Sequence, residues 1–170
     1  MKKDLSTYLL AYPDNPVGKR FIDAFLQKGL PLSGIIVETG AGGGKLKRLR
    51  KKIHVDGIIC AFYRIGQVFA MKFFRTNAVS AAEKHDIPVY EVKKFNSRAC
   101  RELLDKLKPD LLVIASAPIL KKYIFSKAQY GCLNAHPGWL PLYRGLGANA
   151  YALKHGHDPG VTVHFIDAGI

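Results

Sequence analysis

An asparagine and a histidine two residues apart, Asn134 and His136, are the side chains of this sequence best suited to chemistry. They close a short apolar run, residues 131–136, that the pattern predicts as a β-strand, in which side chains two positions apart point to the same side. An amide and an imidazole placed together can stabilise an oxyanion that develops on a carbonyl carbon, and the imidazole can also shuttle a proton. The spacing alone is equally consistent with a structural hydrogen-bonded pair.

Prolines and glycines punctuate the segment that follows this strand, at Pro137, Gly138, Pro141 and Gly145. Pro137 ends the strand because proline has no N–H to donate to the ladder. The tight loop predicted here holds Trp139, Tyr143 and Arg144.

The elements that must position this pair alternate along the chain between strands and helices. Apolar runs bounded by turn residues predict strands at 7–12, 34–38, 87–92, 110–115, 131–136 and 161–167, and helical spacing predicts helices at 17–27, 77–85, 97–107, 119–125 and 147–155. This alternation predicts an open, doubly wound α/β fold, a mostly parallel sheet with helices on both faces. Ligands bind such sheets beyond the carboxyl ends of the strands, which is where Asn134 and His136 stand.

A second candidate site, the glycine-rich run Thr39–Lys45, departs from the known phosphate loops. A Walker loop needs glycine where Thr39 stands and serine or threonine where Leu46 stands. We interpret the run as a hinge into the basic segment that follows it.

The positive charge is concentrated in one insertion-like segment, residues 40–75, which holds nine of the 26 Lys and Arg residues and one Asp. Six of the eight residues from Lys45 to Lys52 are basic, and apolar and aromatic residues follow them. Three interpretations stay open: a solvated charged face beside an apolar helix, a surface for a membrane or partner protein, and a nucleic-acid contact. Composition does not choose among them.

Length and composition indicate one globular domain over residues 1–170, with 40–75 as an insertion within it. Of the 170 residues, 48% are apolar and 23% charged, which excludes a disordered or collagen-like chain. The three cysteines are widely spaced and odd in number, so they predict neither a disulfide framework nor a zinc site, and no other cluster has metal-ligand spacing. With no pattern of a signal peptide, we expect a reducing, cytoplasmic location.

The run GCLNAHPGWLPLYRGLGANAYAL, followed by GVTVHFIDAGI, resembles the signature of the 10-formyltetrahydrofolate-dependent formyltransferases. That family has an Asn-x-His-x-x-x-Leu-Pro-x-Tyr-x-Gly core, then a helix, then a Gly-Val-Thr-Val-His-like strand. The resemblance is specific over residues 108–170, looser over 7–38 and 77–107, and does not cover 40–75. It implies a Rossmann-like fold and an enzyme that transfers a formyl group from 10-formyltetrahydrofolate to a primary amine.

The resemblance also implies roles for particular residues. Asn134 and His136 match the catalytic amide and imidazole, which would polarise the formyl carbonyl and stabilise the tetrahedral intermediate formed when an amine attacks. The folate pocket would be built mostly from backbone groups, of Pro118, Ile119 and Leu120 against the pterin ring and of Ile166, Asp167 and Ala168 on the far side. The loop beside the active site would be shaped by Leu140, Pro141 and Tyr143. The remaining histidines match no catalytic position: His164 is expected as a sheet residue, and His54, His85, His155 and His157 as surface residues.

One departure from the family pattern bears on activity. The third catalytic residue of the family is an aspartate that follows a Gly-Ile or Gly-Leu pair, and here the sequence ends on that pair, Gly169 and Ile170. Asp167 lies four positions too early and matches the folate pocket instead. We therefore expect a truncated catalytic domain that is weakly active or inactive by itself.

The acceptor amine stays open between a nucleotide-linked amino sugar, glycinamide ribonucleotide and the amino group of methionyl-tRNA, in that order of preference. The tRNA is disfavoured because it would need a further domain. A hydrolase that releases formate from the same donor would use a similar site. The competing class is a non-catalytic folate- or nucleotide-binding module whose segment 45–75 docks a partner protein, nucleic acid or membrane surface.

Overall fold

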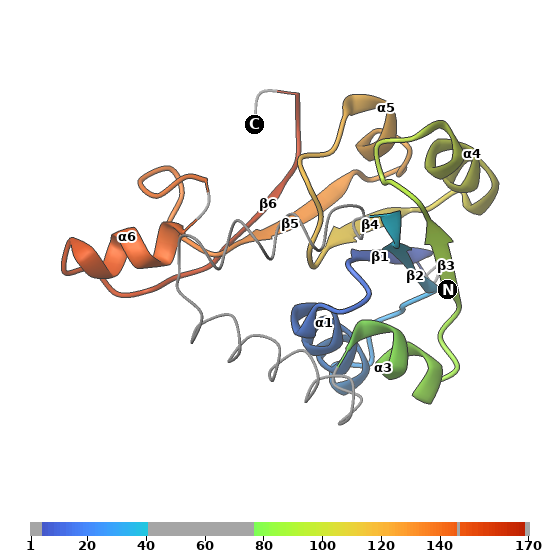
Figure 1. Ribbon diagram of the computed structural model, residues 1–170, viewed down its shortest axis with the longest axis horizontal. Coiled ribbons are helices and arrows are strands. Elements are labelled where there is room, and N and C mark those ends of the chain that lie inside the picture. Colours follow the sequence, from blue (N-terminus) through green and yellow to red (C-terminus); the bar gives the residue numbers. More distant parts are fainter. Residues whose placement is uncertain (1–4, 41–76, 146, 169–170) are drawn as a thin grey trace, which may run out of the picture.

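The computed structural model of the chain describes residues 5–40, 77–145 and 147–168, and a six-stranded sheet forms its centre (Figure 1). The strands lie in the order β3 (Val89–Val92), β2 (Gly34–Glu38), β1 (Thr7–Ala11), β4 (Leu111–Ile114), β5 (Cys132–His136) and β6 (Thr162–Phe165). The first five run parallel, and β6 runs antiparallel to β5. The expectation of a mostly parallel, doubly wound sheet is confirmed, and the strand order reverses between β1 and β4.

Helices cover both faces of the β3-β2-β1-β4 part of the sheet. On one face, α1 (Pro16–Gln27) and α3 (Ala78–Lys84) contribute Ile22, Ala78 and Ala81 to one core cluster. On the other face, α4 (Arg98–Leu107) and α5 (Lys122–Phe125) contribute Cys100, Leu104 and Ile124 to a second. Alternate residues of one strand enter different clusters, so the apolar runs of β1 and β2 are continuous because both faces are buried.

Capping side chains fix where three of these helices begin. Asn15 accepts a hydrogen bond from the Val17 amide at 2.8 Å, and Asn77 accepts one from the Ser80 amide at 2.8 Å. The cap of α4 is Ser97, whose hydroxyl oxygen accepts from the Cys100 amide at 3.2 Å. These polar residues satisfy amide groups that have no partner inside the first turn.

The predicted helix over 119–125 is shorter in the structure and begins only at Lys122. The residues before it are held in another conformation by Asn96, whose side chain accepts from the Lys121 amide at 2.7 Å and donates to the Ile119 carbonyl at 2.8 Å. Asn96, which precedes the cap of α4, thus fixes a neighbouring loop.

The β5-β6 side of the sheet is more open. Only the first residue of β5 is buried, and alternate residues of β6 are exposed, with Val163 at 65% and Phe165 at 55%. The helix that joins these strands, α6 (Ala148–Lys154), lies at the far end of the molecule, away from α1, α3, α4 and α5 (Figure 1). This side therefore leaves strand residues within reach of a ligand.

The glycine run after Gly40 and the basic segment up to residue 75 lie outside the described residues, together with His54 and Cys60. The interpretations of residues 40–75 as a hinge and a basic insertion are therefore not tested. Within the ranges described above, no helix has the length and hydropathy needed to cross a bilayer.

Candidate active site beyond strands β4 and β5

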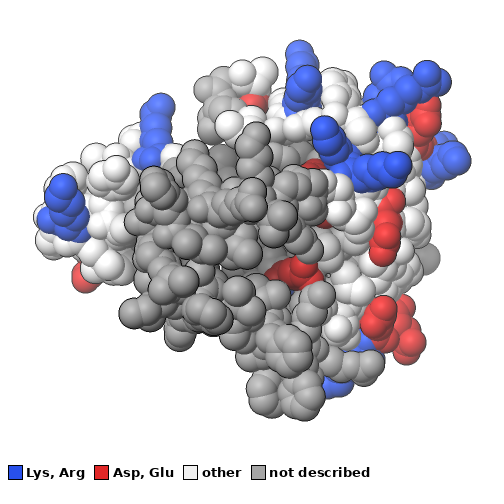
Figure 2. All heavy atoms as spheres, viewed as in Figure 1, with Lys and Arg blue, Asp and Glu red and all other residues white. Residues whose placement is uncertain are grey.

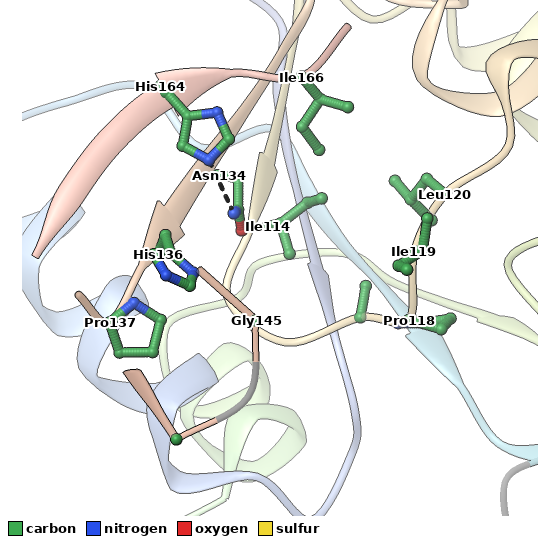
Figure 3. Close-up of a pocket in the computed structure, with 12 residues that line it drawn as sticks. Ile114, Pro118, Ile119, Leu120, Asn134, His136, Pro137, Gly145, His164 and Ile166 are labelled. Atoms are coloured by element: carbon green, nitrogen blue, oxygen red, sulfur yellow. Dashed lines mark hydrogen bonds between the residues drawn. The ribbon is translucent and has the colours of Figure 1, made fainter. Parts of the chain in front are cut away.

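A cavity of about 380 Å³ opens beyond the ends of β4 and β5 (Figure 3). Its volume lies within the usual range for small-molecule sites, roughly 300–1,000 Å³. It lies beside the point where strand order reverses, which is the general ligand position in this class of sheet. The lining residues come from β4, β5, β6 and the segment that follows each of these strands: Ile114, Ala117, Pro118, Ile119, Leu120, Asn134, His136, Pro137, Gly145, Gly147, His164 and Ile166.

Both residues of the predicted pair line this cavity. Asn134 and His136 lie two positions apart on β5 and are half-buried. The residues that alternate with them, Leu133 and Ala135, line an apolar groove of about 340 Å³ near α1 instead. The two-residue periodicity of the strand thus separates the polar side chains of β5 from its apolar ones.

Asn134 has a side-chain partner on the neighbouring strand. Its Nδ2 lies 3.2 Å from Nε2 of His164, which is the residue directly opposite in the antiparallel register (Figure 3). His164 Nδ1 lies 3.0 Å from the Phe165 carbonyl, which can only accept, so Nδ1 carries the proton and Nε2 accepts from the amide. This bond fixes the orientation of the Asn134 amide and uses one of its two N–H groups.

His136 is held by the loop that follows β5. Its Nε2 lies 2.9 Å from the carbonyl oxygen of Tyr143. Because a carbonyl oxygen accepts and cannot donate, Nε2 is the protonated nitrogen of this contact. The ring atom that can then take up a proton is Nδ1.

The opposite wall of the cavity comes from the segment after β4. Leu120 is buried in the core beneath the cavity, whereas the Ile119 side chain is 87% exposed. Asn96 fixes the backbone here through the two hydrogen bonds already described. The wall therefore presents apolar side chains on a backbone that Asn96 holds by two hydrogen bonds.

Of the remaining residues that the sequence predicts for the site, one lines the cavity and five do not. Ile166 lines the cavity, and its amide donates to the Cys132 carbonyl at 2.8 Å. Asp167 and Ala168 are exposed and do not line it. Leu140, Pro141 and Tyr143 lie in the adjoining loop and do not line it either, and the Leu140 amide is tied to Thr162 Oγ1 at 3.0 Å.

Sequence reasoning missed His164 as part of the site. It lies in β6, as expected, and it also lines the cavity beside Asn134. A period-2 pattern shows which residues of one strand share a face, but it does not show which residues of the neighbouring strand lie opposite them. The pairing of His164 with Asn134 depends on β6 running antiparallel to β5. His85, His155 and His157 are exposed, as expected.

The described lining of the cavity offers hydrogen bonds and little fixed charge. Its polar side chains are Asn134, His136 and His164, and none of its residues is Asp, Glu, Lys or Arg. The described residues as a whole hold fifteen Lys and Arg against eleven Asp and Glu. Figure 2 shows that many of these basic side chains lie toward the α4 and α5 side, where Arg98 pairs with Glu102 at 2.6 Å and Lys127 with Asp105 at 2.5 Å. Across the described ranges, no group of three or more His, Cys, Asp or Glu side chains gathers as a metal site would.

Comparison with known sequences points to one family. The model of a family described as "Formyl transferase" matches residues 72–170. The chain is 38% identical over 92 residues to the methionyl-tRNA formyltransferase of Syntrophus aciditrophicus, covering 53% of this chain and 30% of that protein. It is 35% identical over 101 residues to that of Kosmotoga olearia, covering 58% and 32%. The chain thus spans about a third of the length of these curated relatives.

Comparison with solved structures identifies the same fold. Glycinamide ribonucleotide transformylase 1 from Symbiobacterium toebii superposes with a TM-score of 0.65 at 19% identity, covering 100% of this chain and 69% of that one. A formyltetrahydrofolate deformylase from Pseudomonas syringae superposes with a TM-score of 0.60 at 16% identity, covering 98% and 47%. At these identities the likeness concerns the architecture alone.

Proposed function

The chain belongs to the formyl transferase family, and on that premise we propose that its cavity binds 10-formyltetrahydrofolate and directs the formyl group to a primary amine. The observation that carries the proposal is the shared cavity of Asn134 and His136 at the end of β5. All lining residues of the cavity fall within the stretch that matches the family.

In the proposed reaction, the acceptor nitrogen forms a bond to the formyl carbon and the bond from that carbon to N10 of the folate breaks. Negative charge develops on the formyl oxygen, and the Asn134 amide donates to it. One such donor is worth roughly 10²–10³ in rate. The amine loses a proton, which Nδ1 of His136 accepts and then returns to N10 of the folate. While His136 holds this proton, its imidazolium adds positive charge beside the oxyanion.

The apolar walls suit the flat pterin ring of the donor. We assign Pro118, Ile119 and Leu120 to one side of it, with their backbone held by Asn96. Ile166 stands on the other side, and Asp167 and Ala168 extend that side beyond the cavity. Backbone groups would form the hydrogen bonds to the polar edge of the ring, because the described lining supplies few polar side chains.

The acceptor is the finer part of the proposal. The curated relatives are named as methionyl-tRNA formyltransferases, which favours the amino group of an aminoacyl-tRNA. A nucleotide-linked amino sugar and glycinamide ribonucleotide are the alternatives that the sequence raised. Apart from Asn134 and His136, which act on the formyl group, the residues that form the cavity are those that would hold the donor, so they do not discriminate among these amines.

The test has two stages. First, a stable 5,8-dideaza analogue of the formyl donor is titrated into the full chain by calorimetry, and saturable binding is expected. Second, formyl transfer from 10-formyltetrahydrofolate is measured with methionyl-tRNA, glycinamide ribonucleotide and a nucleotide-linked 4-amino sugar. The double variant Asn134→Ala/His136→Ala should retain analogue binding and lose transfer, while His85→Gln, an exposed histidine at the end of α3, should behave as the unchanged protein.

Failure of the analogue to bind at millimolar concentration would contradict the proposal, because it would remove the folate site. Transfer by the chain itself is expected to be weak at most. Measurable transfer to one of the three amines would identify the acceptor and exclude the non-catalytic binding module.

A further inference from the structure

We propose that Tyr143 is a positioning residue for His136. Its carbonyl oxygen holds the imidazole in the Nε2–H tautomer, and its hydroxyl is anchored by two histidines, His155 and His157, at the end of α6. The tautomer and the anchor stand on geometry alone, and only their effect on turnover rests on the proposed function.

The first part of the link joins the loop to the imidazole. The Tyr143 carbonyl lies 2.9 Å from His136 Nε2, and no proton donor other than Nε2–H is available in that contact. The packing around it is close: a Cβ added at Gly138 would lie 3.1 Å from the Tyr143 oxygen, 3.2 Å from His136 Nε2 and 2.5 Å from the Ala148 Cβ. Glycine at 138 therefore lets the start of α6 and the loop approach the end of β5.

The second part joins the same residue to the other end of α6. Tyr143 Oη lies 2.8 Å from His157 Nδ1 and 3.2 Å from His155 Nδ1. A phenol has one proton to donate and lone pairs to accept with, so one imidazole accepts from it while the other donates Nδ1–H to it. The tyrosine ring also packs against both imidazoles, with centroid distances of 5.9 Å to His155 and 5.8 Å to His157.

The two contacts make Tyr143 a bridge between an exposed histidine pair and a cavity residue. A loop carbonyl by itself is a poor support, because loops move more than the elements they connect. Here the side chain of the residue that carries the carbonyl is fixed at two points, His155 and His157, in the segment that follows α6. Removing those points should let the carbonyl move and release the His136 tautomer.

The test measures the tautomer directly, without donor or acceptor. The full chain is labelled with ¹⁵N-histidine, and two-bond ¹⁵N–¹H correlations at pH 8 separate the protonated from the unprotonated ring nitrogen of each histidine. The His136 signals are assigned by their disappearance in His136→Gln. We expect the Nε2–H pattern for His136 in the unchanged protein, and a shift of its two nitrogen signals toward each other in Tyr143→Phe.

The histidine pair should act through the same route. His155→Ala/His157→Ala should give the same shift of the His136 nitrogen signals as Tyr143→Phe. The triple variant should shift them no further, since both changes remove the same anchor of the Tyr143 hydroxyl. Tyr151→Phe, an exposed tyrosine of α6, is the matched control and should leave His136 unchanged. Because these side chains are exposed or half-buried, circular dichroism is expected to show a folded protein in each case.

An Nδ1–H pattern for His136 in the unchanged protein would overturn the proposal. So would unaltered His136 signals in either Tyr143→Phe or the double histidine variant. Where formyl transfer is measurable, Tyr143→Phe should lower kcat by as much as about 100-fold with the KM for the donor unchanged, because it misplaces a reacting group rather than a binding contact. Since the nitrogen shifts are recorded without substrates, failure of the proposed function would leave them unaffected.

Discussion

The two sides of the sheet differ in what covers them. Every residue of β1 and β2 is buried between helices, whereas β5 is buried only at Cys132 and β6 alternates between half-buried and exposed residues. We call β2, β1 and β4, with the helices that cover them, the covered half, and β5 and β6 the open half. In the part of the chain that the structure describes, the polar side chains of the cavity all come from the open half.

The difference shows how one sheet separates stability from chemistry. Two helical layers leave room only for apolar side chains, and the buried polar groups of the covered half stand at its edges with structural partners. Glu38, for example, ends β2 and accepts from the Phe95 amide at 2.7 Å. In the open half, an amide and two imidazoles can face a ligand because water already reaches their strands. Substitutions in the two halves should therefore affect different quantities.

The largest effect is expected at Asn134. Asn134→Ala should lower the rate of formyl transfer roughly 10²–10³-fold, about 3–4 kcal/mol in barrier height, because it removes the proposed donor to the oxyanion. Asn15→Ala makes the same change in the covered half, where the side chain caps α1, and should cost about 1 kcal/mol of unfolding free energy with kcat unchanged. Kinetics and urea denaturation of both variants test the separation. A large loss of stability in Asn134→Ala would show instead that the open half is structural.

The second prediction compares one substitution in two strands. Val37 on β2 is fully buried and Val163 on β6 is 65% exposed. Val37→Ala should lower the free energy of unfolding by about 2–3 kcal/mol, from lost burial and the cavity left behind. Val163→Ala should change it by less than about 0.5 kcal/mol. Equal losses in urea denaturation would mean that β6 is covered in solution and would remove the distinction between the halves.

The third prediction concerns two neighbours at the border of the halves. Asn96→Ala removes the hydrogen bonds that fix the backbone of residues 119–121, so the affinity for the donor analogue should fall by about fivefold, or 1 kcal/mol. Ser97→Ala removes the cap of α4 and should cost about 1 kcal/mol of stability with the affinity unchanged. Calorimetry gives the affinity of each variant for the analogue, and urea denaturation gives its stability. An unaltered affinity in Asn96→Ala would show that the backbone of residues 119–121 does not contribute to donor binding.

The elements of both halves could be predicted from the sequence. The apolar runs of β1, β2, β4, β5 and β6 and the helical spacing of α1 and α3 are local signals, and the structure has strands and helices at those positions within a few residues. The pairing of Asn134 with His136 on one face followed from the strand period. The contacts of His164, Asn96 and Tyr143 could not be predicted in the same way, because each joins segments whose relative position is set by strand direction or loop path.

The smallest effect at neutral pH is expected at Cys132, the one residue of β5 that is as buried as the covered half. Burial raises the pKa of its thiol from 9.0 to about 12. Above pH 9 the unfolded chain loses this proton while the folded chain keeps it, so the unfolded state binds fewer protons and stability falls as pH rises. The contribution of the Cys132 thiol to the free energy of unfolding is complete below pH 9 and is lost between pH 9 and about 12, with a loss on the order of 0.5–1 kcal/mol by pH 9.5.

Denaturation at pH 7.5, 8.5 and 9.5 should therefore show a shallower decline of the unfolding free energy in Cys132→Ala than in the unchanged protein. Cys100→Ala should be shallower too, because burial and, to a lesser extent, the charge of Glu38 raise the pKa of that thiol to about 11. If Cys100→Ala alone flattened the decline, β5 would be open from its first residue.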